Sequence, residues 1–162
     1  MFRILTEKPE DSGPIETLLN QVFGPDRQGK TSYTYRHNIA AIADLCLVAR
    51  DRDKVVGSLR FWPVNVGHTG ALLLGPIGVS PDRQKTGIGR ALMARGHFLA
   101  RSKGYGIVLL VGNGDYYCRF GYMPAGDYGI SMANEQPHRL LVHELRSGVL
   151  RGVSGEVLIK PA

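Results

Sequence analysis

Hydrophobic and polar positions change their period several times along the chain, and these changes predict a succession of strands and helices. Residues 2–6 form a short apolar run with strand character. Apolar positions then recur at helical spacing from Ile15 to Phe23, before the helix-ending pair Gly24–Pro25. A weaker helical pattern over residues 31–42 predicts a second helix.

The middle of the chain predicts a hairpin followed by an interrupted strand. Residues 45–50 and 55–66 have strand character and flank a charged turn, so they are expected to pair with each other. Residues 71–79 form a further apolar run that contains Pro76. Because proline cannot donate a hydrogen bond to a sheet, this strand should bulge or part from a neighbour near Gly75 and Pro76.

The second half of the chain predicts one long helix, one buried strand and several shorter elements. Residues 87–103 have helical spacing, and Gly104 follows as a C-terminal stop. Residues 107–111 form a continuous apolar run, the pattern of a strand covered on both faces. Shorter patterns predict a helix at residues 116–120 and strands at residues 138–145 and 153–159.

The order of these elements predicts a mixed α/β fold around a central strand–loop–helix–strand unit. No repeat or linker divides the pattern, so residues 1–162 are expected to form a single domain. Its core should cover about residues 2–146, and the last strand should lie in a tail at residues 147–162.

Composition narrows the class of protein. Hydrophobic residues make up 43% of the 162 residues and charged residues 21%, which is ordinary for a soluble protein. No apolar run reaches the ~18 residues that a membrane span needs, and polar residues come too early for a signal peptide. The two cysteines, Cys46 and Cys118, match no metal or redox spacing. We therefore expect a reduced, cytoplasmic protein with no membrane partner.

The charge of the chain favours an anionic ligand. Its formal net charge of +6 is a modest surplus, well short of a nucleic-acid-binding signature. No nucleic-acid partner is expected. His138 and His143 have no third metal-ligating residue type beside them, so no metal is expected either.

The segment that carries chemistry is the loop at residues 83–92, which follows an apolar strand and opens the long helix. The first turn of a helix has unpaired N–H groups and the positive end of the helix dipole. Free N–H groups from Gly87 to Arg90 would wrap a pyrophosphate, and glycines there allow close approach. Arg83 and Lys85 add positive charge nearby.

Three kinds of anion-binding loop can be compared with this segment. A Walker A loop needs a glycine before Lys85, where Gln84 stands. A dinucleotide fingerprint begins well with Gly87 and Gly89 but has Leu92 in place of its third glycine. A third pattern, Gln/Arg-x-x-Gly-x-Gly/Ala, is met in full. A glycine-rich helix start that binds no ligand is the remaining alternative at this point.

Residues 84–92 resemble the acyl-coenzyme-A-binding motif of the GCN5-related N-acetyltransferase (GNAT) superfamily. A second segment, Tyr117-x-x-x-Gly121-Tyr122, resembles the Tyr-x-x-x-Gly-Phe/Tyr segment of the same superfamily, about thirty residues downstream. The wider stretches at residues 74–81 and 116–122 are similar to the YhbS-like branch of predicted acetyltransferases. This resemblance implies a central mixed sheet that is splayed at the strand containing Pro76 and flanked by helices.

The resemblance also implies roles for individual residues. The strand backbone at Ile77, Gly78 and Val79 would pair with the pantetheine arm of coenzyme A (CoA), and the Val79 N–H is a candidate oxyanion donor. Tyr117 matches the family tyrosine that acts as general acid toward the CoA sulfur. The thioester would lie in the cleft between residues 77–79 and 107–111. The pyrophosphate would be held by Arg83, Gln84, Lys85, Thr86, Gly87, Ile88, Gly89 and Arg90.

By resemblance, the protein is an N-acetyltransferase that moves an acetyl group from acetyl-CoA to a primary amine by direct attack on the thioester, without a metal. A small-molecule amine is the expected acceptor, with a protein acceptor and a homodimer left open. The first helices and residues 61–70 are expected to select the acceptor. Residues 71–79 lack the glutamate that serves some relatives as general base. His68 and Asp115 are candidates, but each is more often a surface turn residue, and a water relay to solvent would suffice for an amine of low pKa. Two rival functions are a non-catalytic acyl-CoA-binding module and a nucleotide-binding regulator.

Overall fold

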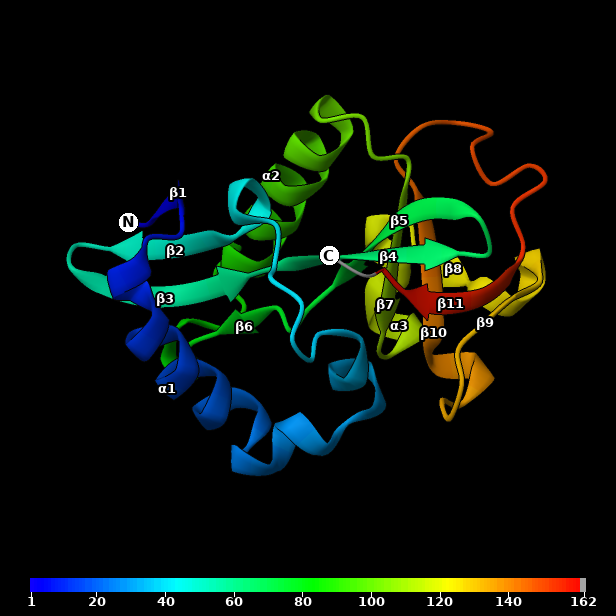
Figure 1. Cartoon of the computed structure of the whole chain (residues 1–162). Coiled ribbons are helices and arrows are strands. Elements are labelled where there is room, and N and C mark those ends of the chain that lie inside the picture. Colours follow the sequence, from blue (N-terminus) through cyan, green and yellow to red (C-terminus); the bar gives the residue numbers. More distant parts are fainter. Residues whose placement is uncertain (161–162) are drawn as a thin grey trace.

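A computed structural model describes residues 1–160 and shows a sheet divided into two halves (Figure 1). Four strands form one half in the order β1-β2-β3-β6, and seven strands form the other in the order β8-β10-β7-β5-β4-β11-β9. Only the pairs β5/β7 and β9/β11 are parallel. The strands of the first half are β1 (Arg3–Thr6), β2 (Leu47–Asp51), β3 (Lys54–Leu59) and β6 (Gly78–Val79). The others are β4 (Phe61–Val66), β5 (Thr69–Leu74), β7 (Ile107–Val111), β8 (Met123–Pro124), β9 (Ile130–Ser131), β10 (Leu140–Glu144) and β11 (Gly155–Ile159).

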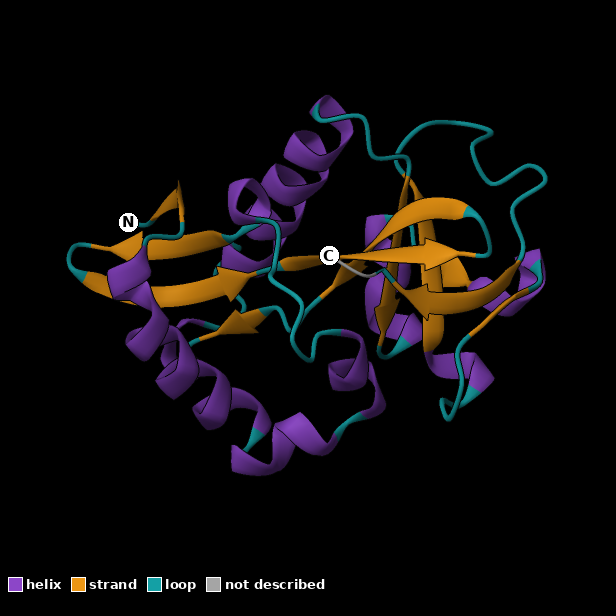
Figure 2. Cartoon of the chain, in the orientation of Figure 1, coloured by secondary structure: helices purple, strands orange, loops and turns teal. Residues whose placement is uncertain are grey.

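Three α-helices accompany the sheet: α1 (Ser12–Phe23), α2 (Ile88–Ser102) and the single turn α3 (Gly114–Tyr117). The two long helices lie against the smaller half of the sheet, while strands dominate the larger half (Figure 2). This mixed α/β architecture confirms the predicted fold class. Within residues 1–160, no helix is both long enough and apolar enough to cross a membrane.

Period-two alternation along β2 explains why the two long helices cover opposite faces of the smaller half. Val48 packs with Ile15 and Leu19 of α1, whereas its neighbours Leu47 and Ala49 belong to the core cluster that includes α2. On the α2 side, Gly96 lets the helix approach closely. A Cβ added at Gly96 would lie 2.8 Å from a Leu59 side-chain carbon and 3.0 Å from the ring of Phe61.

The chain crosses between the two halves of the sheet at Arg60. The prediction of one strand over residues 55–66 is therefore wrong: β3 ends at Leu59 and β4 begins at Phe61. The Arg60 guanidinium donates two hydrogen bonds, of 2.6 and 2.8 Å, to the Glu7 carboxylate. Glu7 and Arg60 are distant in sequence, so a local strand pattern contains no sign of this break.

A second crossing, at Gly75 and Pro76, opens the sheet and confirms the predicted parting of strands. β5 runs parallel to β7 through Leu72 and Leu73, whereas β6 pairs with β3 instead. Between β5 and β6 the register slips by one residue. Phe61 faces Leu74, so an unbroken register would place residue 77 opposite Ser58, but Gly78 is found there. One extra residue in a strand is a β-bulge, and it leaves a wedge between β6 and β7.

The predicted helix over residues 31–42 is wrong. Only residues Thr31–Tyr35 are helical, as a 3₁₀ turn, and the chain then continues without regular structure. The Thr34 hydroxyl donates a 2.8 Å hydrogen bond to the Thr31 carbonyl, which competes with α-helical bonding. Asn38 has a φ of 58°, in the left-handed region that an α-helix does not contain.

A cluster of aromatic and imidazole rings joins the end of the tyrosine segment to α2. The Tyr122 hydroxyl lies 2.8 Å from Nε2 of His97, and the ring centroids of His97 and His143 are 4.9 Å apart. Burial, reinforced by His143, lowers the pKa of His97 from its ordinary value to about 4. His97 is therefore neutral in the folded protein at neutral pH.

This low pKa predicts an acid-sensitive contribution to stability. Below about pH 6.5 the unfolded chain binds a proton on His97 that the folded protein does not bind until about pH 4. The free energy of unfolding should therefore fall as the pH drops through this window. Between pH 7 and pH 5 the wild type should lose about 2 kcal/mol more than His97→Gln, measured by urea unfolding. Equal losses in the two proteins would contradict the assignment.

Candidate active site

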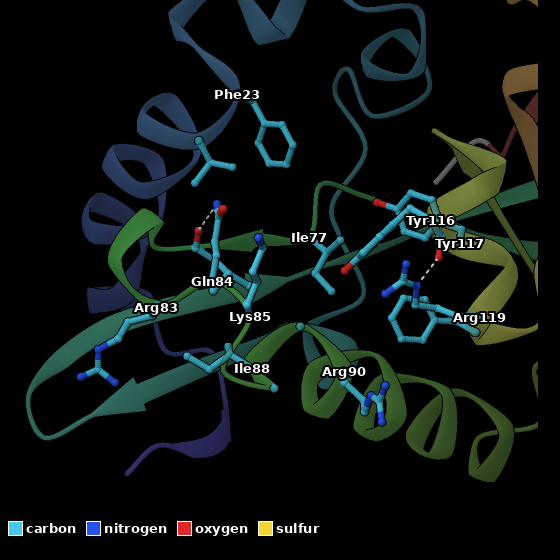
Figure 3. Close-up of a pocket in the computed structure, with 15 residues that line it drawn as sticks. Phe23, Ile77, Arg83, Gln84, Lys85, Ile88, Arg90, Tyr116, Tyr117 and Arg119 are labelled. Carbon is cyan, nitrogen blue, oxygen red and sulfur yellow. Dashed lines mark hydrogen bonds between the residues drawn. The ribbon is translucent and has the colours of Figure 1, made fainter.

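A cavity of about 730 Å³ lies beside β6. Its walls come from four elements: the end of α1, the β6 segment, the loop into α2, and the α3 turn (Figure 3). Ten of the predicted site residues line it together: Ile77, Val79, Arg83, Gln84, Lys85, Gly87, Ile88, Gly89, Arg90 and Tyr117. Two others, Gly78 and Thr86, are not among the lining residues. Gly78 packs against Leu19 of α1, and the Thr86 hydroxyl donates to the Arg83 carbonyl.

The loop before α2 is shaped to present backbone N–H groups. Lys85 has a φ of 64° and Gly87 a φ of 91°, so the chain turns sharply just before the helix begins at Ile88. The Ala91 N–H makes the first intrahelical bond, to the Gly87 carbonyl at 3.0 Å. The N–H groups of Ile88, Gly89 and Arg90 therefore precede the helical ladder, and they lie in the cavity wall at the positive end of the helix.

The edge of β6 that does not pair with β3 also faces the cavity. The Ser80 N–H donates to the Val56 carbonyl at 2.9 Å, which fixes the edge of β6 that pairs with β3. Backbone groups of successive residues in an antiparallel strand point to opposite edges, so the N–H and C=O of Val79 point away from β3. In agreement, the Gln84 side chain reaches the Val79 carbonyl at 3.3 Å.

The cavity is electropositive. Of the described residues that line it, four are basic and none is acidic. One basic charge is already partnered, because Arg83 forms an ion pair with Asp51 at the β2–β3 turn. Another, Arg119, was not predicted from the sequence. Its Nε donates to the Tyr116 carbonyl at 2.9 Å and its guanidinium lies 4.7 Å from the centre of the Tyr116 ring, so it is held over the cavity.

Tyr117 lies where this cavity meets a second, smaller one of about 70 Å³. Phe23, Ile77 and Tyr117 line both, so they mark the junction. Burial raises the pKa of Tyr117 to about 12. Its ring packs tightly on the turn after β7: a Cβ added at Gly112 would lie 2.6 Å from it. A protonated phenol is therefore fixed where the linings of the two cavities share Tyr117.

Tyr116, the next residue, occupies a different part of the same cavity. Its side chain is 40% exposed, and its hydroxyl would lie 3.6 Å from a Cβ built at Gly89. Tyr116 therefore reaches across to the first turn of α2, away from the junction at Tyr117. Its ring meets that of Tyr117 edge-on, with centroids 4.9 Å apart.

The candidates for a general base do not join the site. His68 is exposed in the turn between β4 and β5, and Asp115 is exposed at the start of α3. Neither lines either cavity, and among the lining residues that the structure describes there is no other histidine or carboxylate. Over residues 1–160, no group of three or more potential metal ligands comes together.

A family profile described as an acetyltransferase (GNAT) domain matches residues 43–124, just over half of the chain. The chain belongs to the GNAT family of acetyltransferases. The matched region of this acetyltransferase runs from the start of the β2–β3 hairpin to the end of the tyrosine segment.

Two Escherichia coli proteins are similar to this GNAT chain over most of its length. The uncharacterized N-acetyltransferase YhbS is 29% identical over 95% of this chain and 93% of its own. The uncharacterized N-acetyltransferase YjhQ is 30% identical over 77% of this chain and 71% of its own. The similarity thus extends well beyond the two short motifs.

Solved structures agree with the fold. The crystal structure of E. coli YhbS in complex with CoA superposes with a TM-score of 0.84 at 27% identity, covering 99% of this chain and 89% of that one. A GNAT acetyltransferase from Brucella melitensis in complex with acetyl-CoA gives a TM-score of 0.73 at 24% identity over 99% and 96%. The second match, at lower identity, supports the fold alone.

Gly87 gives a direct test of the loop geometry. Its φ of 91° favours glycine, whereas a Cβ there would meet no atom within 4 Å, so any cost of Gly87→Ala is conformational. We expect the variant to lose about 1 kcal/mol of unfolding free energy in urea titrations. Gly13→Ala, in α1 with equal space and no positive φ, is the control and should lose none. A similar loss in both variants would refute the assigned turn.

Proposed function

We propose that this protein is an N-acetyltransferase that transfers an acetyl group from acetyl-CoA to a primary amine by direct attack on the thioester. One observation carries the proposal: an electropositive cavity, walled by helix N–H groups, meets a second cavity at a buried, protonated tyrosine. Such an arrangement suits two substrates that react at the junction. The complex of E. coli YhbS with CoA, in a structure 27% identical to this chain, supports the choice of acyl donor.

The residues of the cavity fit the chemistry of CoA. Its pyrophosphate needs hydrogen-bond donors and positive charge, which the N–H groups from Gly87 to Arg90, Lys85 and Arg119 supply. The amides of its pantetheine arm need backbone partners, and the free edge of β6 offers the C=O of Val79, which leaves the Val79 N–H for the acyl carbonyl. A cavity of about 730 Å³ is within the range of ligand sites.

Acetyl-CoA, when bound, supplies an activated acyl carbonyl. The protein contributes two donors beside it. The Val79 N–H would stabilise the negative charge that develops on the carbonyl oxygen. As the C–N bond forms and the C–S bond breaks, the Tyr117 hydroxyl would give its proton to the departing sulfur and would be reprotonated by the proton that the attacking nitrogen loses. The raised pKa of Tyr117 keeps its proton in place before the reaction.

The amine should arrive in its neutral form. No described carboxylate or histidine lines either cavity, so the side chains beside the junction offer no general base. Two cations, Lys30 and Arg36, line the smaller cavity. Positive charges near an ammonium group lower its pKa, so they favour loss of its proton to solvent.

A single substitution separates catalysis from binding. Tyr117→Phe removes the proposed acid and keeps the ring, so turnover should fall by about a hundredfold or more. The dissociation constant for CoA, measured by calorimetry, should change little. Turnover is measured as release of free thiol with an amine acceptor.

Tyr116→Phe is the matched control, because it removes a hydroxyl from the neighbouring ring in the same cavity. Its turnover should stay close to that of the wild type. Equal losses in the two variants, or parallel losses of turnover and CoA affinity in Tyr117→Phe, would refute the acid role. CoA binding without acceptor-dependent thiol release would favour the non-catalytic module, and binding of NAD or ATP alone would favour the nucleotide-binding regulator.

The pH dependence tests the absence of a protein base. The rate constant kcat/KM should rise with pH as the acceptor amine loses its proton, and its midpoint should follow the pKa of the amine that is used. Tyr117 must stay protonated, and its pKa of about 12 predicts no alkaline decline below about pH 11. The measurement is thiol release with amines of different pKa. A midpoint that stays fixed across these amines would reveal a titrating protein group.

A further inference from the structure

The smaller cavity, on the side of Tyr117 away from the α2 loop, has an unusual charge balance. The 3₁₀ segment around residues 30–36 forms one wall and the Leu74–Ile77 crossing forms another. Lys30 and Arg36 both line it, and no described lining residue is acidic. If the proposed function is correct, this cavity receives the acceptor, because the larger one takes the acyl donor. The following inference rests on that assignment.

Arg36 is held rigidly between two aromatic rings. Its guanidinium carbon lies 4.0 Å from the centre of the Tyr33 ring and 4.7 Å from that of Trp62. Both rings are themselves anchored. The Tyr33 hydroxyl accepts a 2.9 Å hydrogen bond from Arg27, and the Trp62 indole N–H donates to the Ile39 carbonyl at 3.1 Å. Stacking of this kind fixes the guanidinium and leaves its N–H edge for a planar partner.

Arg36 has no carboxylate partner among residues 1–160, in contrast to its arginine neighbours. Arg27 pairs with Glu16, and Arg60 pairs with Glu7. The Nε of Arg36 is buried and has no hydrogen-bond partner among these residues, and a guanidinium nitrogen makes only a long 3.5 Å contact to the Ser32 hydroxyl. Burial also lowers the pKa of Arg36. Arg36 is partly exposed, and a half-buried cation without a carboxylate partner is costly, which favours an external anion at the exposed part of its guanidinium.

We propose that the acceptor carries a carboxylate and that Arg36 binds this group in the smaller cavity, so that the amine of an amino-acid-like small molecule is held beside Tyr117. The planar guanidinium matches the two oxygens of a carboxylate through parallel hydrogen bonds. A cavity of about 70 Å³ suits a group of that size. Lys30, which lies 5.3 Å from the centre of the Phe23 ring at the junction, adds attraction for an anion.

Arg36 also borders a surface hollow of about 490 Å³, which Tyr117 does not line. The cations of that hollow are Lys8, Arg36 and Arg60, and the one carboxylate among its described lining residues, Glu7, is already paired with Arg60. Its charge balance is therefore similar to that of the smaller cavity. The position of Tyr117 assigns the anion to the smaller cavity, because an acceptor whose carboxylate binds Arg36 must also place its amine beside Tyr117.

The test measures product binding, so it does not require the natural acceptor. CoA-loaded protein is titrated by calorimetry with N-acetylated amino acids of increasing chain length, from N-acetylglycine upward, and with their amides. At least one carboxylate should bind about tenfold or more tightly than its amide. Trp62 is the only tryptophan in the chain and stacks on Arg36, so its fluorescence should change saturably with the carboxylate.

Three variants locate the effect. Arg36→Met keeps the length of the side chain but removes the charge, so the preference for carboxylate over amide should disappear. Arg36→Lys keeps the charge without the planar guanidinium. The affinity of this variant for the carboxylate should lie between that of Arg36→Met and that of the wild type. Arg95→Met is the control, because Arg95 is exposed on α2 beside Phe98 and lines neither cavity. CoA affinity should be unchanged in all three.

The outcomes separate this inference from the proposed function. Equal binding of carboxylates and amides, no saturable response to either, or an unchanged preference in Arg36→Met would overturn the carboxylate assignment while CoA binding stands. Tighter binding of the matching N-acetylated aminoalkyl phosphates than of every carboxylate would also overturn it, in favour of a phosphate. Failure of the wild type to bind CoA or acetyl-CoA would instead overturn the proposed function itself.

Discussion

The break in the strand at Gly75 and Pro76 is the constraint on which the rest of the site depends. The Trp62 ring lies against Gly75 so closely that an added Cβ would be 2.4 Å from it, so only glycine fits. The Gly75 N–H donates to the Arg60 carbonyl at 2.8 Å, so the pairing with β4 continues to this residue, and Pro76, which has no N–H, follows it. Beyond Pro76 the strand contains one extra residue and pairs with β3, so this break turns β6 away from β7. Without it the two strands would stay paired, and there would be no wedge for a ligand to enter.

The same break supplies both halves of the binding surface. On one side it frees the edge of β6, whose backbone groups at Val79 face the cavity. On the other it directs the chain into the loop where Gly87 turns and α2 begins, so that unpaired N–H groups face the same space. The basic side chains that line the cavity add to the positive potential of these N–H groups. Arg83 forms an ion pair with Asp51, which fastens the loop to the β2–β3 hairpin. Rigid backbone donors therefore provide the binding surface, with flexible side chains in a supporting role.

Tyr117 links the larger cavity, the proposed CoA site, to the smaller one. Its neighbours on the protein side, Tyr122 and His97, form a buried polar pair that fixes the segment after α3 against α2. On the cavity side lie Phe23 from α1 and Ile77 from the strand break. Arg36, which lines the smaller cavity, stacks on Trp62, the same tryptophan whose ring excludes a side chain at Gly75. The strand break and the proposed acceptor site therefore share one aromatic ring.

The sequence by itself determined the parts of the site that lie close together in the chain. The helix start at Gly87, the tyrosine segment at Tyr117 and the parting at Pro76 are local, because a turn, a proline or a helix terminus acts on its own neighbours. Only the tertiary structure decided that Phe23 and Arg119 line the cavity and that the second hairpin strand breaks at Arg60. It also decided that residues 31–42 do not form a helix, and that Arg36 in this segment stacks on Tyr33 and Trp62. These features depend on contacts between distant segments, and the packing energy of such contacts outweighs local propensity without leaving a periodic pattern in the sequence.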